Sequence, residues 1–99
     1  MVEIIKKDNN IIFKIKNNID LYIEPKIKKE ISKYLDKDYD IFTIDLANVK
    51  YIDSCGLGMF VYLAKLIETK NKKLIIQSVP NEVMKVFKVG RFDKLLNII

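Results

Sequence analysis

The sequence has no histidine, no tryptophan and only one cysteine, Cys55. Without histidine, nucleophilic mechanisms that need an imidazole base are excluded. A lone cysteine cannot form a disulfide within the chain, and it has no cysteine neighbours with which to build a metal cluster. We therefore expect a non-enzymatic protein with no catalytic residues, no metal and no cofactor.

Long apolar runs are also absent. No run approaches the ~18 residues of a membrane span. Near the N-terminus, Ile4 and Ile5 are followed at once by Lys6 and Lys7, which does not fit a signal peptide. We expect a cytoplasmic protein that does not insert into the membrane.

Arginine is scarce, since Arg91 is the only one, and the net charge of +5 comes from lysines scattered along the chain. Arginine is the side chain best suited to bidentate contacts with phosphates and bases. The diffuse positive charge therefore does not predict a nucleic acid partner. A favourable charge match with an acidic protein partner stays open.

The length of 99 residues and the apolar fraction of 49% fit a single globular domain over residues 1–99. Alternation and short apolar runs predict strands over residues 2–7, 11–16, 41–46 and 74–77. Helical spacing predicts helices over about residues 25–35, 55–70 and 80–90. The segment 92–99 is ambiguous. Strands separated by single helices predict an α/β fold with a central mixed sheet of four to five strands and helices packed on one side.

The segment Tyr51–Gly58 places an acid, a hydroxyl and two glycines before a strongly apolar helical run. Unpaired N–H groups and the dipole at a helix N-terminus favour negative charge, so a phosphate on Ser54 would be stabilised there. The structural alternative is that Asp53 or Ser54 is only an N-cap, and that Gly56 and Gly58 permit a tight turn.

With Ile44–Val49 before it, this segment resembles the signature of the STAS domain of bacterial anti-sigma factor antagonists. Asn17–Asp20 resembles the family's Gly-x-Ile-Asp, and Ser78–Pro80 resembles the start of its third helix. In two departures, Cys55 stands where Ser, Thr or Ala is usual, and Asn17 stands where Gly is usual. Asparagine adopts left-handed backbone angles readily, and cysteine is close to serine in size.

The resemblance implies a STAS fold and a regulator that binds an anti-sigma factor with serine kinase activity, so that the sigma factor is released. It also implies that this kinase phosphorylates Ser54, which ends the binding, and that a metal-dependent serine phosphatase reverses the modification. The alternative is a STAS scaffold subunit that does not switch, in a stress-sensing complex or a lipid transporter. Retention of Ser54 favours the switch.

Three acidic residues are candidates for the surroundings of Ser54, because each lies at or near the end of a strand. Asp20 and Asp53 could form an acidic rim that orients the hydroxyl toward the kinase and its magnesium, or they could cap loops, and for Asp45 we favour capping. We expect Cys55 and Gly56 to pack in the first helical turn, the alternative for Cys55 being a reactive redox thiol.

The helix after Ser54 carries two apolar stripes. One is expected to face the core, and it comprises Leu57, Phe60, Val61, Ala64 and Ile67. The other, Met59, Tyr62 and Leu66, lies more than a right angle away around the helix at 100° per residue, too far for one sheet to cover both. We expect Met59, Tyr62 and Leu66 to bind the partner, the alternative being cover by the helix that contains Val83 and Val86.

Overall fold

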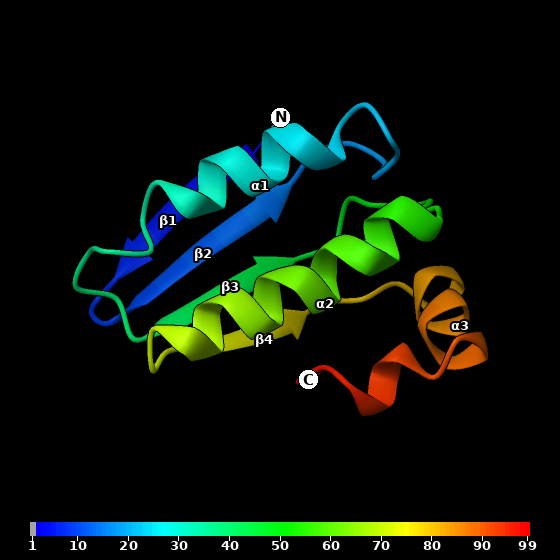
Figure 1. Ribbon diagram of the computed structural model, residues 1–99. Coiled ribbons are helices and arrows are strands. Elements are labelled where there is room, and N and C mark those ends of the chain that lie inside the picture. The colour runs from blue at the N-terminus through cyan, green and yellow to red at the C-terminus, as the bar shows by residue number, and fades with distance from the viewer. Residues whose placement is uncertain (1) are drawn as a thin grey trace.

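Strands and helices alternate after an opening hairpin in the computed structural model, which describes residues 2–99 (Figure 1). The elements are β1 (Val2–Lys7), β2 (Asn10–Ile15), α1 (Glu24–Ser32), β3 (Ile41–Asp45), α2 (Ser54–Thr69), β4 (Lys73–Gln77), α3 (Asn81–Val89) and the 3₁₀ turn η1 (Phe92–Lys94). Among these residues, no helix combines the length and the apolar character needed to cross a bilayer.

The four strands form one mixed sheet in the order β1-β2-β3-β4. β1 and β2 pair antiparallel, whereas β2 with β3 and β3 with β4 pair parallel. Each parallel step moves in the same direction across the sheet, and right-handed crossovers then place both connecting helices on the same face. This confirms the predicted α/β fold with a mixed sheet.

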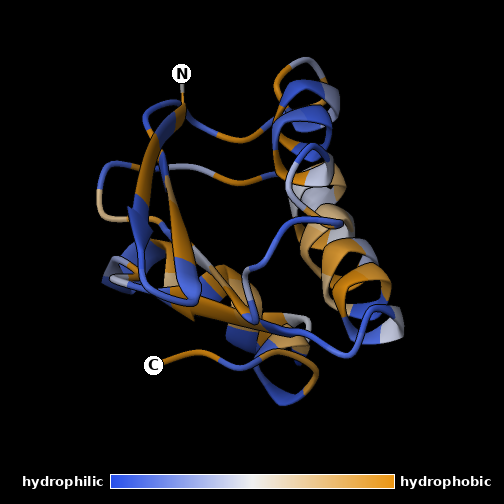
Figure 2. Cartoon of the chain, turned by 90° about the vertical axis from the view of Figure 1, so that its left-hand side faces the viewer, coloured by the Kyte–Doolittle hydropathy of each residue, from blue (hydrophilic) through white to orange (hydrophobic). Residues whose placement is uncertain are grey.

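The core lies between the sheet and the helices α1 and α2, which form a second layer (Figure 2). Alternate residues of β2 point into it, and Ile11, Phe13 and Ile15 are fully buried. Phe60 of α2 packs against Phe87 of α3 with ring centroids 5.5 Å apart. This contact ties α3 to the core at the end of the sheet where α2 begins (Figure 1).

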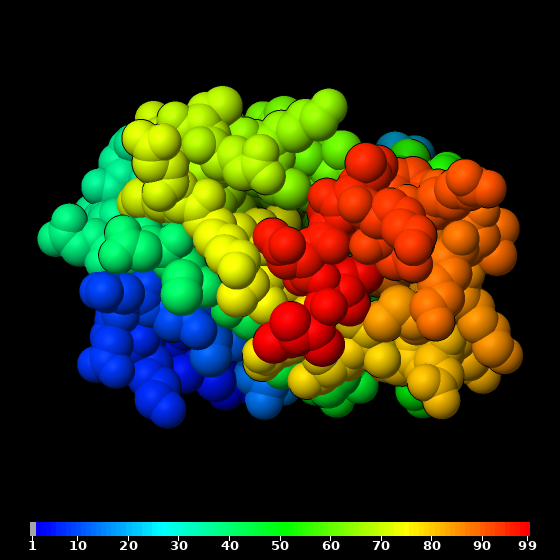
Figure 3. All heavy atoms as spheres, turned by 90° about the horizontal axis from the view of Figure 1, so that it is seen from below, coloured from blue at the N-terminus to red at the C-terminus, as the bar shows by residue number. Residues whose placement is uncertain are grey.

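The ambiguous segment 92–99 lies along the free edge of β4. The Ile76 N–H donates to the Asn97 carbonyl at 2.9 Å, and the Ile99 N–H donates to the Ile76 carbonyl at 2.9 Å. This single bridge covers part of the β4 edge without forming a further strand. On the surface, the C-terminal segment lies between β4 and α3 (Figure 3).

The prediction of which residues of α2 are buried is wrong, because the buried face is rotated around the helix axis. Met59 is only 2% exposed, and Leu63, which neither stripe included, is fully buried, while Val61 and Ala64 are half-buried. The buried arc is turned about 60° from the expected stripe. The reason is that α2 packs against α1 as well as the sheet, so its apolar face must serve both.

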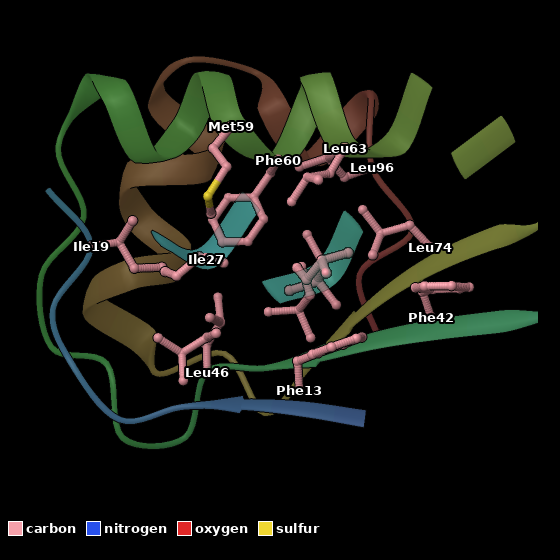
Figure 4. Packing of buried hydrophobic residues seen from close by; sticks show 14 of the residues in the cluster. Phe13, Ile19, Ile27, Phe42, Leu46, Met59, Phe60, Leu63, Leu74 and Leu96 are labelled. Carbon is pink, nitrogen blue, oxygen red and sulfur yellow. The ribbon is translucent and has the colours of Figure 1, made fainter. Parts of the chain in front are cut away.

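Met59 therefore does not belong to an exposed surface. Its side chain points into the core toward Ile19 and Ile27, which belong to the β2–α1 loop and to α1 (Figure 4). For Met59 the cover is thus not the helix with Val83 and Val86, which was the alternative from the sequence. α1 also ends at Ser32, so Tyr34 and Leu35 lie beyond the helix, although Leu35 is buried.

The rotation predicts different effects for two substitutions on α2. Met59→Ala should lower the free energy of unfolding by about 2–4 kcal/mol, because it leaves a cavity in the core. Tyr62→Ala should lower it by less than about 1 kcal/mol, since Tyr62 is 49% exposed. Urea denaturation measures the free energy of unfolding of both variants. Equal losses would contradict the burial of Met59.

Candidate functional site

Two loops pair at the end of the sheet where α2 begins. The Ile19 N–H donates to the Tyr51 carbonyl at 3.0 Å, and the Asp53 N–H donates to the Ile19 carbonyl at 3.2 Å. The Asn18 side chain adds to this by accepting hydrogen bonds from the Lys50 and Tyr51 N–H groups at 3.0 and 3.2 Å. These contacts join the β2–α1 loop to the β3–α2 loop and fix where α2 starts.

Asp53 is the N-cap of α2, and Ser54 is its first residue. The Asp53 carboxylate accepts a hydrogen bond from the Gly56 N–H at 3.0 Å, while the Ser54 side chain is exposed. Among residues 2–99, the N–H groups of Ser54 and Cys55 have no hydrogen-bond acceptor, because the first turn of a helix leaves such donors free. Ser54 thus presents its hydroxyl at the positive end of a 16-residue helix.

The other two carboxylates also act as caps. Asp20 accepts hydrogen bonds from the N–H groups of Tyr22 and Ile23, at 2.9 and 3.0 Å, just before α1. Asp45 accepts from the Ala47 N–H at 2.9 Å and from the Gln77 amide at 3.1 Å. The pairing of Ile19 with Ile52 brings Asp20 beside Asp53, whereas Asp45 is directed toward β4.

Residues 2–99 contain no group of three or more His, Cys, Asp or Glu side chains placed to hold a metal ion. Cys55 is half-buried in the first turn of α2. Asn17 is not among the residues with a positive φ, so the backbone there does not require the glycine that is usual in the family. The arrangement offers an exposed acceptor hydroxyl at the first position of α2.

Of the predicted partner-binding residues, Tyr62 alone is well exposed, because Met59 is buried and Leu66 is half-buried. The Lys28 ammonium lies 4.3 Å from the centre of the Tyr62 ring, which links α1 to the outer face of α2. Ser54, Gly58 and Tyr62 are spaced by four residues and are all exposed, so they share one face of the helix.

Asn18 is the residue of this site that the sequence did not single out for a role. Its only signal was its place in the segment Asn17–Asp20, whose side chains give no indication of a partner about thirty residues away. The contact depends on the parallel pairing of β2 and β3, which brings the two following loops to one edge of the sheet.

The cap predicts the effect of substitutions at Asp53. Asp53→Ala should lower the free energy of unfolding by about 1 kcal/mol, because the Gly56 N–H loses its acceptor. Asp53→Asn is the matched control, since asparagine caps almost as well, and it should cost only a few tenths of a kcal/mol. Equal losses for the two variants in urea denaturation would show that the cap contributes little.

The two glycines of the signature should respond in opposite directions to alanine. A Cβ at Gly56 would lie 2.7 Å from Ile52 Cγ2 and 2.8 Å from Ile19 Cγ2, so Gly56→Ala should destabilise the fold by about 1–2 kcal/mol. A Cβ at Gly58 meets nothing within 4 Å, so Gly58→Ala should stabilise it by about 0.5–1 kcal/mol. Thermal unfolding of both variants tests this, and a stabilising Gly56→Ala would contradict the packing.

Comparison with known proteins places this geometry in a family. The STAS domain family matches residues 1–99. The anti-sigma-B factor antagonist of Listeria monocytogenes is 29% identical over 98 residues, which cover 98% of this chain and 86% of that protein.

Solved structures show the same fold. A Thermotoga maritima protein, described as a proposed anti-sigma factor antagonist, has a TM-score of 0.89 at 22% identity and covers 98% of this chain and 84% of that one. The anti-sigma factor antagonist SpoIIAA, in its unphosphorylated form, has a TM-score of 0.82 at 14% identity. The match covers 100% of this chain and 88% of that one. Its phosphorylated form has a TM-score of 0.75 at 13% identity, and the match covers 100% of this chain and 91% of that one. This chain therefore belongs to the STAS domain family, and its Listeria monocytogenes relative is an anti-sigma-B factor antagonist.

Proposed function

We propose that this protein is an anti-sigma factor antagonist that acts in the cytoplasm by binding, without catalysis of its own. Its partner is an anti-sigma factor with serine kinase activity, and binding frees the sigma factor for transcription. Phosphorylation of Ser54 ends the binding, and a metal-dependent serine phosphatase restores it. The observation that carries this proposal is the exposed Ser54 hydroxyl at the first position of α2, beside the capping Asp53.

The position of Ser54 is suited to reversible modification. The kinase transfers a phosphoryl group from ATP to the exposed hydroxyl, which requires no unfolding of the core. The phosphate brings a charge of about −1.5 to −2, which the free N–H groups of Ser54 and Cys55 and the helix dipole stabilise. The modified chain can therefore keep its fold while the surface at Ser54 gains negative charge.

The neighbouring surface explains how such a change would reach a partner. Ser54, Gly58 and Tyr62 follow one another along the exposed face of α2, spanning about 12 Å at 1.5 Å per residue. Tyr62 supplies an aromatic anchor of the kind found at binding hot spots. Gly58 leaves that face without a side chain, so a partner can approach the helix closely. Leu66 lies half-buried at its edge.

A scaffold subunit that does not switch would have no need of a hydroxyl at this place. The carboxylates of Asp20 and Asp53 each hold backbone N–H groups, yet both lie beside Ser54 at the edge where the kinase must approach. We propose that they keep the loop in the shape that presents the hydroxyl. A magnesium ion, where one takes part, belongs to the kinase and its ATP.

Phosphate transfer tests the proposal directly. The purified chain is incubated with candidate anti-sigma kinases from the same genome and ATP, and the modified residue is located by mass spectrometry. We expect phosphate on Ser54 and none on the Ser54→Ala variant, although Ser32 and Ser78 are also exposed. Ser54→Asp should bind the kinase roughly tenfold more weakly than the unmodified chain, because it carries part of the phosphate charge.

Two results would contradict the switch. One is transfer to the Ser54→Ala variant at the same rate as to the original chain. The other is tight binding to the kinase with no transfer to any serine, which is the behaviour of a scaffold subunit. Ser32→Ala serves as the control for hydroxyl loss at an exposed helical position.

A further inference from the structure

An apolar groove lies where the first turn of α2 meets α3. It has a volume of about 350 Å³ and is lined by Leu57, Lys85, Val86, Val89 and Gly90. Val86 and Val89 are three residues apart and so share one side of α3, and Gly90 follows as its C-cap. Val89 is 87% exposed, which is unusual for a valine on a short helix that already buries Val83 and Phe87. The groove is thus an apolar hollow at the edge of the core, where Leu57 and Val86 pack with the core while Val89 stays exposed.

One basic residue lines this groove. It is Lys85, and Lys88, Arg91 and Lys94 are exposed further along the same stretch of chain, where only Glu82 and Asp93 oppose them. None of the four cations forms an ion pair within residues 2–99, since the salt bridges there involve other lysines. Clustered charge of one sign beside low-dielectric walls attracts ligands of the opposite sign.

The groove lies close to Ser54. Leu57, which lines it, is three residues beyond Ser54 and about 60° away around α2, roughly one helical turn from the hydroxyl. A partner that covers Ser54 therefore also reaches the groove. The groove alone is too small for a stable interface, which usually buries at least ~1,200 Å², so the exposed face of α2 must supply the rest.

We propose that the groove receives an acidic segment of the anti-sigma factor kinase, which inserts one apolar side chain between Leu57 and Val89 and directs its carboxylates to Lys85. This inference rests on the function proposed above and names the chemistry of the docking. It also gives a physical reason for release, because a phosphate on Ser54 repels the carboxylates of the segment and competes with them for Lys85. Both effects are electrostatic and are therefore screened over the Debye length of ~8 Å at physiological ionic strength.

The test measures the affinity of the full unphosphorylated chain for the kinase by isothermal titration calorimetry. Lys85→Glu reverses the charge at the rim, and Val89→Ser removes the apolar wall. Each should weaken binding at least tenfold. Lys7→Glu is the matched control, since it makes the same charge change at an exposed residue of β1, at the far end of the sheet, and it should change affinity less than twofold. Affinity of the original chain should also fall as salt is raised.

Each alternative outcome has a definite meaning. If Ser54 is phosphorylated and the kinase binds, but either groove variant binds within twofold of the original, the groove inference is overturned and the proposed function stands. A loss for Lys7→Glu equal to that for Lys85→Glu overturns it too, because charge alone then explains the effect. If the original chain neither binds the kinase nor is phosphorylated, the groove inference and the proposed function are both overturned. Sedimentation of the free chain gives the last outcome, since a dimer abolished by Val89→Ser assigns the groove to a second copy instead.

Discussion

The backbone bridge between Ile19 and Ile52 is the contact on which the site depends. It holds the β2–α1 loop against the β3–α2 loop and sets the residue at which α2 begins. Gly56 sits against the side chains of the same two isoleucines, where a Cβ would not fit. Ile19 and Ile52 therefore provide both the backbone pairing and the close packing at the start of α2. Together they place Asp53 as the cap and Ser54 as the first, exposed residue of the helix.

This arrangement separates stability from signalling. The side of α2 that holds the protein together carries Met59, Phe60, Leu63 and Ile67, and it is buried between the sheet and α1. The side that carries Ser54, Gly58 and Tyr62 is exposed, and the contact of Tyr62 with Lys28 joins it to α1. A modification on that side can change binding while the core stays intact. This suits the partner switching proposed for the protein.

Charge has a different role in each part of the molecule. The carboxylates of Asp20, Asp45 and Asp53 are used locally, as acceptors for N–H groups in loops and at helix starts. Lys85 and Lys88 of α3 form no salt bridge within residues 2–99, and Lys85 lines the apolar groove between α2 and α3. The net charge of +5 is thus diffuse along the sequence, and one of its lysines stands beside an apolar groove.

The sequence by itself determined the order of strands and helices, the α/β class and the place of Ser54, because alternation, helical spacing and the Asp-Ser-Cys-Gly-Leu-Gly pattern are all local. The register of α2 against its neighbours was decided only by the tertiary structure. Met59 and Leu63 are buried because α1 closes over that side of the helix, and no spacing within residues 54–69 contains the position of α1. The same holds for Asn18, whose partners follow β3, and for the groove, which joins α2 to α3 across the end of the sheet. Hydrophobic periodicity in the sequence indicates which residues share one face of a helix. Which neighbouring elements that face contacts depends on how the helices and strands pack.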